Sequence, residues 1–570
     1  MRFLSILIGL LILTACARQG TPTGGPRDET PPRFLNATPD TLSTNVSTDL
    51  SEIRIDFDEY LVLKDYTQNI IVSPPLSSTT TFTPVGTPNK SIRIKLNETL
   101  APNTTYNINF GNAIQDHNEG NILPYFQYVF STGEYIDSLE LKGKVRVPFV
   151  REQPKNLMVG LYKIDSTYND SIILQQKPLY IAKANEKGEF TLNYLKEGKY
   201  QLIAFDDEVN NMQYDFGKEK FGFIDEFIDL NEFSTQDLQI ELFDQRKDYR
   251  VDKAEQKGYG HILFRFEGEV DEVEIEALNF DFQTSIIDYI PKSDSLNFWF
   301  NPSLDSIAET SKRLQFAVKH LDKIDTVSLV YSNTQQHQLR LERLGKLEIS
   351  PERKPKFTSN YPIKNLDASK VSVFSDSIAL DVQIIADTID KHSFVVDFPI
   401  ELESSYEIQM YPEMLTDIFG QTNDTLNFNF KTKPRNSFGN LKLILDPKPE
   451  HPFWIQLLDN NDKVLEEHYT EDSEFVFNYL LPEQYYFKIL VDENRNGHWD
   501  NGDFFSKTQA EKSYIYPSMV NVRALWTIEE VWKLPIDSAT IEEETEEIES
   551  SEETSIDENE KSPSEEEDLN

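Results

Sequence analysis

The chain has 570 residues, a formal net charge of −42 at pH 7 and a single cysteine. Nucleic acid is excluded as an expected partner because a binder needs a basic face to neutralise phosphates. The negative net charge also disfavours direct adsorption of the protein to anionic lipid. One cysteine allows no intrachain disulfide, so packed cores must supply the stability. The length predicts about four domains of roughly 150 residues each, or more if they are small.

The chain opens with an export signal that ends at its only cysteine. Arg2 is followed by an apolar run from Phe3 to Leu13 and then by Leu-Thr-Ala-Cys16. The run is short for a membrane span, and small residues precede the cysteine, as in a cleaved signal. This ending resembles the lipobox of bacterial lipoproteins. The resemblance implies a signal peptide over residues 1–15 and acyl lipid on Cys16; the alternative is an ordinary signal with a chance cysteine.

The residues after the cysteine predict where in the cell the protein is located. Acyl chains contribute about 0.8 kcal/mol per buried CH₂, so two or more hold a protein on a membrane stably. Ala17 is not an inner-membrane retention residue in the lipoprotein pattern, which favours the outer membrane. Surface-export tags are usually acidic, whereas Ala17-Arg18-Gln19 is not. The resemblance therefore implies an outer-membrane lipoprotein of the cell envelope, with the periplasmic face slightly favoured over the cell surface.

Both ends of the chain lack the pattern of a folded domain. Residues 16–32 are rich in Gly, Pro and Thr, which predicts a flexible tether behind the lipid. Residues 536–570 hold sixteen acidic residues against one lysine, Lys561. Such a segment buries too little apolar surface to fold, and we expect a disordered acidic tail.

Between these ends the sequence is typical of β-structure. Phe (37) and Tyr (25) are abundant and Met (6) is scarce, which favours strands over helical bundles. Short segments such as Ile53–Phe57, Ser91–Leu96 and Tyr106–Phe110 alternate apolar and polar residues, the period of half-buried strands. We therefore expect an all-β chain of tandem small β-sandwich modules.

Residues 33–135 and 347–435 share a strand–loop–strand pattern that closes on Phe-x-Thr. The shared residues are Leu100, Tyr106-Asn107-Ile108, Asp116, Gly120 and Phe130-Ser131-Thr132 in the first copy, and Leu402, Tyr406-Glu407-Ile408, Asp417, Gly420 and Phe430-Lys431-Thr432 in the second. The arrangement resembles the bacterial Ig-like domain first described in S-layer proteins. Pro31-Pro32 before the first copy and Ser73-Pro74-Pro75 within it fit that family.

A second pair of repeats links residues 138–245 and 437–535. Glu189-Phe190, Asn193-Tyr194-Leu195, Tyr200 and Asp206 parallel Glu474-Phe475, Asn478-Tyr479-Leu480, Tyr486 and Asp492, if one residue is inserted near Leu481-Pro482. This pattern of residues is similar to that of the transthyretin-like, carboxypeptidase-regulatory-type β-sandwich. Residues 250–345 form a further β-rich module without a partner, so five modules are expected on the lipid tether.

The sharpest chemical motif runs from Asp492 to Asp503. It places oxygen-bearing side chains and a turn glycine, Gly497, at the positions of a twelve-residue calcium loop. The expected ligands are Asp492, Asn494, Asn496, the backbone carbonyl of His498, Asp500 and Asp503. Asp503 stands where a bidentate Glu is usual, and no amphipathic helices flank the loop. We predict a structural Ca²⁺ site; the alternative is a hairpin turn that uses its side chains for local hydrogen bonds.

The earlier repeat carries a loop that looks degenerate. Counted from Asp206, it has Asn211 in place of the turn glycine, Tyr214 at position 9 and Gly217 at the closing position. Two oxygen ligands are then missing, and no ion is expected there.

No sequence motif of an enzyme is present. There is no Gly-x-Ser-x-Gly, no His-Glu-x-x-His, no phosphate loop and no zinc spacing, and the eight histidines are scattered. Trp499, Trp526 and Trp532 are possible sugar platforms, but core packing is the favoured interpretation. We predict a non-catalytic, membrane-anchored envelope protein that presents its modules to a protein or glycan partner. The alternative is a glycan-processing or glycan-capture accessory with an unrecognised carboxylate site.

Overall fold

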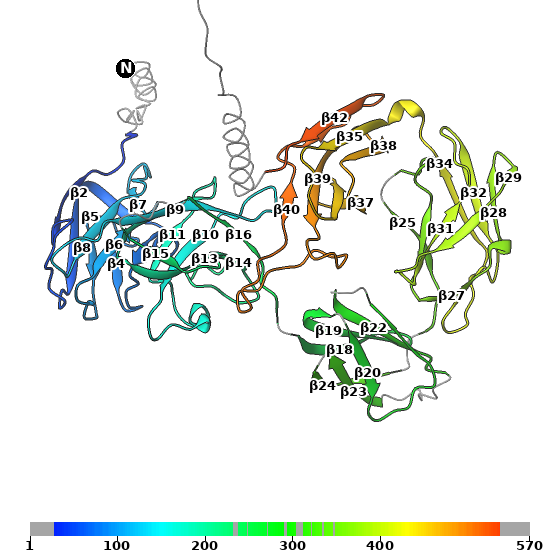
Figure 1. Cartoon of the computed structure of the whole chain (residues 1–570), viewed down its shortest axis with the longest axis horizontal. Coiled ribbons are helices and arrows are strands. Elements are labelled where there is room, and N and C mark those ends of the chain that lie inside the picture. The colour runs from blue at the N-terminus through cyan, green and yellow to red at the C-terminus, as the bar shows by residue number, and fades with distance from the viewer. Residues whose placement is uncertain are drawn as a thin grey trace, which may run out of the picture. The chain divides into compact units, whose positions relative to one another are not determined.

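The computed structural model describes residues 28–231, 237–247, 249–270, 272–289, 293–303, 312–320, 322–332, 336–345 and 348–535 (Figure 1). The predicted signal peptide, Cys16 and the acidic tail lie outside the described residues. Within them the chain is almost entirely strands and turns, so the all-β prediction is confirmed. The helical elements are α2 (Tyr66–Asn69) and 3₁₀ turns at Asp170–Leu174, Ala368–Lys370 and Arg435–Ser437. A search of the described residues finds no helix long and apolar enough to cross a membrane.

The described chain divides into two compact units. The first contains residues 28–146 and 153–242, and the second contains residues 147–152 and 243–535. The five-module order stays a prediction, and the sheets are described below within each unit.

The first unit begins with two sheets that enclose one core. One sheet has the order β1 (Phe34–Thr38), β2 (Glu52–Leu63), β5 (Asn89–Lys95) and β4 (Thr81–Thr83), with β7 (Ile114–Asp116) on β2. The other has the order β3 (Ile71–Ser73), β6 (Thr105–Asn109) and β8 (Gln127–Ser131). The apolar residues of the alternating segments point inward, among them Ile53, Ile55, Ile92, Ile94 and Ile108.

The rest of the first unit is a second pair of sheets. One contains β12 (Glu189–Leu195), β9 (Leu139–Arg146) and β16 (Asp237–Glu241), with β16 parallel to β9. The other contains β11 (Tyr180–Lys183), β10 (Leu157–Lys163), β13 (Gly198–Asp206) and β14 (Lys220–Phe223), with β15 (Ile228–Leu230) also on β13. Gly143 lets β16 approach closely, because a Cβ at this position would lie 2.2 Å from the carbonyl oxygen of Leu238.

The second unit starts with β17 (Phe243–Asp244) and a phenylalanine-rich region over residues 249–332. One of its sheets has the order β18 (Arg250–Gly258), β19 (His261–Val270), β22 (Ser293–Phe300) and β21 (Ser285–Asp288). The other has the order β20 (Val273–Ala277), β23 (Lys312–His320) and β24 (Lys323–Tyr331). Phe264, Phe298 and Phe316 pack between them.

Residues 336–435 fold around a core of their own. One sheet has the order β25 (Leu341–Leu344), β26 (Lys356–Ser359), β31 (Ser393–Asp397) and β30 (Gln383–Ala386). A second sheet pairs β27 (Ile363–Leu366) with β33 (Leu415–Asp417). A third sheet has the order β29 (Ile378–Leu380), β28 (Val371–Ser375), β32 (Ser405–Met410) and β34 (Leu426–Lys431). Their apolar faces enclose Phe357, Val373, Phe394 and Ile408.

The last region repeats the plan of the second half of the first unit. Strand β35 (Gly439–Leu445) lies between β38 (Glu474–Leu480) and β42 (Thr527–Trp532), and β42 is parallel to it. The facing sheet has the order β37 (Val464–Thr470), β36 (Phe453–Leu458), β39 (Gln484–Val491) and β40 (Ser513–Ile515), with β41 (Val520–Asn521) on β39.

The two repeats of this plan align without an insertion between the Asn-Tyr-Leu segments (Asn193–Leu195 and Asn478–Leu480) and the tyrosines that follow them. The Tyr200 hydroxyl donates to the carbonyl oxygen of Lys196, and the Tyr485 hydroxyl donates to that of Leu481, four residues earlier in both cases. Tyr200 therefore corresponds to Tyr485 and not to Tyr486. From β12 and β38 to the loops that follow β13 and β39, each residue of the second copy lies 285 positions after its counterpart, as 485 does after 200. The predicted one-residue insertion is wrong because the sequence offers two adjacent tyrosines, and only the hydrogen bond distinguishes them.

Candidate cation-binding loop

The predicted calcium loop follows β39 and is anchored by a fully buried carboxylate. Asp492 accepts hydrogen bonds from the backbone N–H groups of Asn496 (3.0 Å) and Gly497 (2.7 Å) and from the Tyr469 hydroxyl (2.6 Å). Burial by itself would raise the pKa of Asp492, but these donors hold it below its usual value. Arg495 and Gly497 adopt left-handed conformations, which fold the chain back around this carboxylate.

Three more of the predicted ligands gather on the same loop. The side-chain amides of Asn494 and Asn496 donate to Asp500 Oδ2 at 2.7 and 2.6 Å. The backbone N–H of His498 donates to the Asn496 side-chain oxygen at 2.8 Å. The loop thus brings carboxylate and amide side chains together, and Ca²⁺ takes its ligands from the oxygens of both kinds.

Asp503, the expected closing ligand, does not join this group. Its carboxylate accepts hydrogen bonds from the side chains of Gln245 and Ser506 and from the backbone N–H of Phe505. These partners lie outside the group around Asp500. Asp503 is therefore paired with groups other than the predicted ligands.

Glu511, just before β40, contacts the loop residues that Asp503 does not. Its carboxylate accepts the backbone N–H groups of Asn494 (3.1 Å) and Asp500 (2.8 Å), and its side chain is buried. Burial raises the pKa of Glu511, and the charges of Asp500 and Asp492 act in the same direction. Sequence reasoning missed this residue because it lies beyond the twelve-residue frame of a standard calcium loop.

The loop combines carboxylate and amide side chains. Among the residues that the structure describes, no three His, Cys, Asp or Glu side chains gather closely enough to hold a metal by themselves. A cation at this loop would also need the side-chain oxygens of Asn494 and Asn496 and a backbone carbonyl.

The earlier repeat contains the same hydrogen-bonded loop. Asp207 accepts the backbone N–H groups of Asn211 and Met212, both at 2.9 Å, and Glu219 accepts those of Val209 (3.2 Å) and Asp215 (2.9 Å). The Asn211 amide donates to Asp215 Oδ2 at 2.6 Å, as the Asn496 amide does to Asp500.

This correspondence corrects the register of the earlier loop. Position 1 is Asp207 and not Asp206, so Asp215 and not Tyr214 lies at position 9, and Glu219 corresponds to Glu511. One oxygen side chain is lost, because the exposed Val209 stands where the later loop has Asn494. Burial raises the pKa of Glu219 to about 7, with the charges of Asp207 and Asp215 adding to the effect.

The three tryptophans considered as sugar platforms differ in their surroundings. Trp532 belongs to the core of the last region, as expected. Trp499 lies within the loop, where its ring nitrogen donates to the carbonyl oxygen of Glu511 at 2.8 Å. The expectation of core packing is wrong for Trp526, which is 59% exposed and carries Arg523 over its ring.

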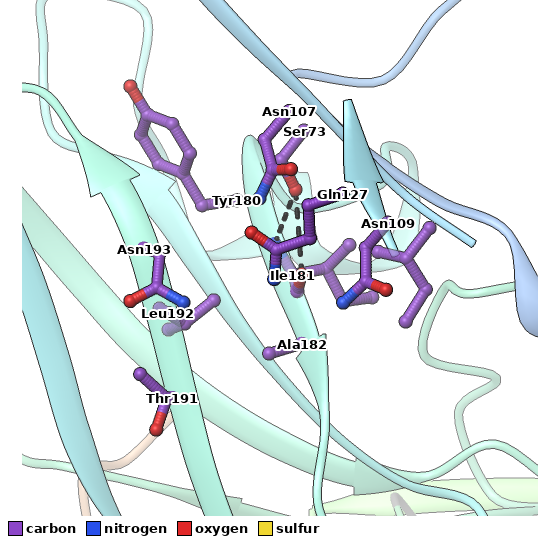
Figure 2. Close-up of a pocket in the computed structure, with 11 residues that line it drawn as sticks. Ser73, Asn107, Asn109, Gln127, Tyr180, Ile181, Ala182, Thr191, Leu192 and Asn193 are labelled. Carbon is purple, nitrogen blue, oxygen red and sulfur yellow. Dashed lines mark hydrogen bonds between the residues drawn. The ribbon is translucent and has the colours of Figure 1, made fainter. Parts of the chain in front are cut away.

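A small pocket lies in the first unit, where β3, β6 and β8 face β11 and β12. Figure 2 shows its amide side chains, Asn107, Asn109, Gln127 and Asn193, around the bonds between Ser73 and the backbone of Ile181. Its volume is about 320 Å³ with the solvent at its mouth included, which is small for a ligand pocket. Its lining contains no carboxylate, imidazole, amine or thiol.

Residues 28–132 match the family model of the bacterial Ig-like domain. This segment is a bacterial Ig-like domain. The resemblance drawn from its strand–loop–strand pattern is therefore confirmed. A comparison with curated proteins finds no match.

A comparison with solved structures aligns this chain with, among others, the following three proteins. The Bacillus anthracis TIE protein is 9% identical over 90% of this chain and 76% of that chain, with a TM-score of 0.13. The S-layer protein SbsC is 10% identical over 87% and 68%, with a TM-score of 0.14. The BSP domain of a biofilm-associated protein is 8% identical over 89% and 99%, with a TM-score of 0.14. Scores this low carry no argument about function.

Proposed function

We propose that this chain is a non-catalytic structural or adhesive protein of the bacterial cell envelope, which presents its β-modules to a protein or glycan partner. The observation that carries the proposal is the bacterial Ig-like domain at residues 28–132, followed by further β-regions with filled apolar cores. Chains of such modules provide length and surface, and their packed interiors leave little room for a catalytic site.

In this proposal acyl lipid on Cys16 anchors the protein, and the protein is located at the outer membrane. The test is metabolic labelling of cells with a fatty-acid probe, comparing the wild type with Cys16→Ala. We expect label and membrane recovery in the wild type and loss of both in the variant. Label that persists in the variant, or wild-type protein in the soluble fraction, contradicts the anchor.

The membrane face is tested by protease treatment of intact and lysed cells. If the modules face the periplasm, they stay protected until the cells are lysed, and an envelope scaffold is supported over an adhesin. Cleavage in intact cells would instead place them outside, where adhesion or glycan capture is the fitting role. A periplasmic marker protein and a surface protein serve as controls.

We also propose that the 492–511 loop binds Ca²⁺ in a structural role, with Asp492, Asn494, Asn496, the carbonyl of His498 and Asp500 as ligands. The contacts of Glu511 and Asp503 described above support Glu511 as the closing carboxylate. Extracellular sites of this kind bind at roughly 10⁻⁴–10⁻³ M.

The two possible closing residues give a sharp test with Tb³⁺ as the probe, since Trp499 in the loop can sensitise its luminescence. We expect Glu511→Gln to abolish the luminescence that Ca²⁺ displaces and Asp503→Asn to retain it. The reverse result would restore Asp503 as the ligand. Equal luminescence in wild type and an Asp492→Ala, Asp500→Ala double variant would remove the site.

A further inference from the structure

Three of the eight histidines meet where residues 249–332 join residues 336–435 in the second unit. They are His261 on β19, His337 before β25 and His392 before β31. These histidines are far apart in the sequence, and each lies within contact distance of aromatic rings from this junction.

His392 makes a polar bridge across the junction. Its Nδ1 lies 2.9 Å from the carbonyl oxygen of Ser359, and its Nε2 lies 3.2 Å from Asp288 Oδ2 on β21. The histidine and aspartate side chains are only 16% and 12% exposed, so solvent screens the pair weakly. Lys391 adds a second hydrogen bond across the junction by donating to the carbonyl oxygen of Ile287 at 3.1 Å.

Aromatic rings make further contacts at the junction. The Trp299 ring stacks on His261 with centroids 3.9 Å apart, and its other ring neighbours include Tyr361 at 5.8 Å and His392 at 5.6 Å. The Tyr259 ring stacks on His337 at 5.0 Å. The His337 Nε2 lies 2.7 Å from Asp417 Oδ2, a carboxylate that is fully buried.

The surroundings of His392 raise its pKa, whereas the surroundings of His261 lower its pKa. Burial by itself would lower the pKa of His392, but Asp288, the Ser359 carbonyl and Asp390 raise it above its usual value. Burial lowers the pKa of His261 to about 4, and the positive charges of His392 and Lys257 act in the same direction. Asn297 and Asp288 offset part of this decrease.

We propose that this junction is a pH-sensitive latch, in which protonated His392 holds Asp288 and so fixes residues 249–332 against residues 336–435. A charge-assisted hydrogen bond is about twice as strong as a neutral one, so deprotonation of His392 weakens the bridge without removing it. The inference concerns regulation of the fold and does not depend on the anchor, the partner or the calcium site proposed above.

The direction of the pH effect follows from linkage. Because the closed junction raises the pKa of His392, its contribution is complete below the pKa of the open state and is lost as the pH rises through the closed-state pKa. His261 acts oppositely, because its contribution is present above about pH 6.5 and is lost as the pH falls toward 4. The latch therefore loosens on the alkaline side through His392.

The test measures the distance across the junction between spin labels on the full chain. Ile324→Cys and Ile378→Cys provide exposed label positions in a Cys16→Ser background. Between pH 6 and pH 8.5 we expect the open–closed ratio to rise as His392 loses its proton, because the closed junction raises the pKa of His392. His392→Gln removes this dependence, and Asp288→Asn does the same from the other side of the junction.

His468→Gln is the matched control, because His468 also pairs with a carboxylate, Glu466, but is 51% exposed and lies outside the junction. This variant should keep the wild-type pH dependence. The latch is overturned if wild-type distances do not change between pH 6 and pH 8.5, or if both junction variants retain the change. Distances measured at pH 6 in each variant show whether the fold itself has survived the substitution.

Discussion

Asp207 and Asp492 are equivalent carboxylates in two loops whose sequences differ at most other positions. Each accepts the backbone N–H groups of the residues four and five positions later. Both carboxylates are at least nine-tenths buried. The anchoring carboxylate is thus common to both copies, whereas Asn494 in the later loop is replaced by Val209 in the earlier one.

Asp492→Ala should destabilise the last region by about 3 kcal/mol even in chelator. Its removal takes the charged acceptor from the N–H groups of Asn496 and Gly497 and from the Tyr469 hydroxyl, and each hydrogen bond to a charged group contributes roughly 1.5–3 kcal/mol. Calorimetry of the full chain measures the shift of the corresponding transition. Asp472→Ala is the control, because Asp472 is exposed and bonds only locally to Thr470. Equal shifts in the two variants would contradict the anchoring role.

Glu219 should make the first unit less stable as the pH rises. The folded state raises the pKa of Glu219 from 4.5 to about 7 and so favours its neutral form. That preference is lost as the pH rises toward 7, which corresponds to about 2 kcal/mol between pH 5.5 and pH 8. Urea unfolding in chelator at both pH values should show this loss in the wild type and a smaller one in Glu219→Gln. An identical pH dependence in the two proteins would argue against a raised pKa.

Met212 and Gly497 should respond oppositely to substitution. They are equivalent turn residues with φ of 59° and 84°, a conformation that glycine adopts without strain. We expect Met212→Gly to stabilise the first unit by about 1 kcal/mol and Gly497→Ala to destabilise the second by a similar amount. A Cβ at Gly497 meets no atom within 4 Å, so the loss would report the backbone alone. Thermal unfolding measures both, and a destabilised Met212→Gly would contradict the assignment.

Thr132 and Thr432 should each contribute about 1–2 kcal/mol. Their hydroxyls donate to the carbonyl oxygens of Ala101 and Glu401 at 2.7 Å and accept the N–H groups of Thr104 and Ser404 at 3.0 Å. Replacement by Val keeps the shape and removes both bonds. Chemical unfolding of Thr132→Val and Thr432→Val measures the loss. Thr83→Val, at an exposed hydroxyl on β4, should change stability by less than about 0.5 kcal/mol.

Much of the fold could be predicted because its strands alternate cleanly. The segments at Ile53–Phe57, Ser91–Leu96 and Tyr106–Phe110 fall in β2, β5 and β6 with their apolar residues inside. The alignment of the two repeats was harder to predict, because Tyr485 and Tyr486 are adjacent and fit the repeat equally well by sequence. The pairing of Tyr485 with the carbonyl four residues earlier is a three-dimensional fact that residue identity does not encode.

The candidate site was predicted only as far as its local contacts extend. Asp492, Asn494, Asn496 and Asp500 lie in one turn, so their spacing was informative. Glu511 reaches the same loop through the pairing of β40 with β39, which no loop pattern describes. The signal that reveals it is Glu219, but only once the two repeats are aligned in the correct register.

The parallel pairing of β9 with β16 and of β35 with β42 has a mechanical consequence. In each region the first strand of the plan lies beside the last, and both run in the same direction. A pull on the two ends of such a region drags these neighbouring strands past each other in opposite directions. The backbone hydrogen bonds between them then bear the load together, in shear, and do not unzip one after another. Both regions are therefore built to resist tension applied along the chain.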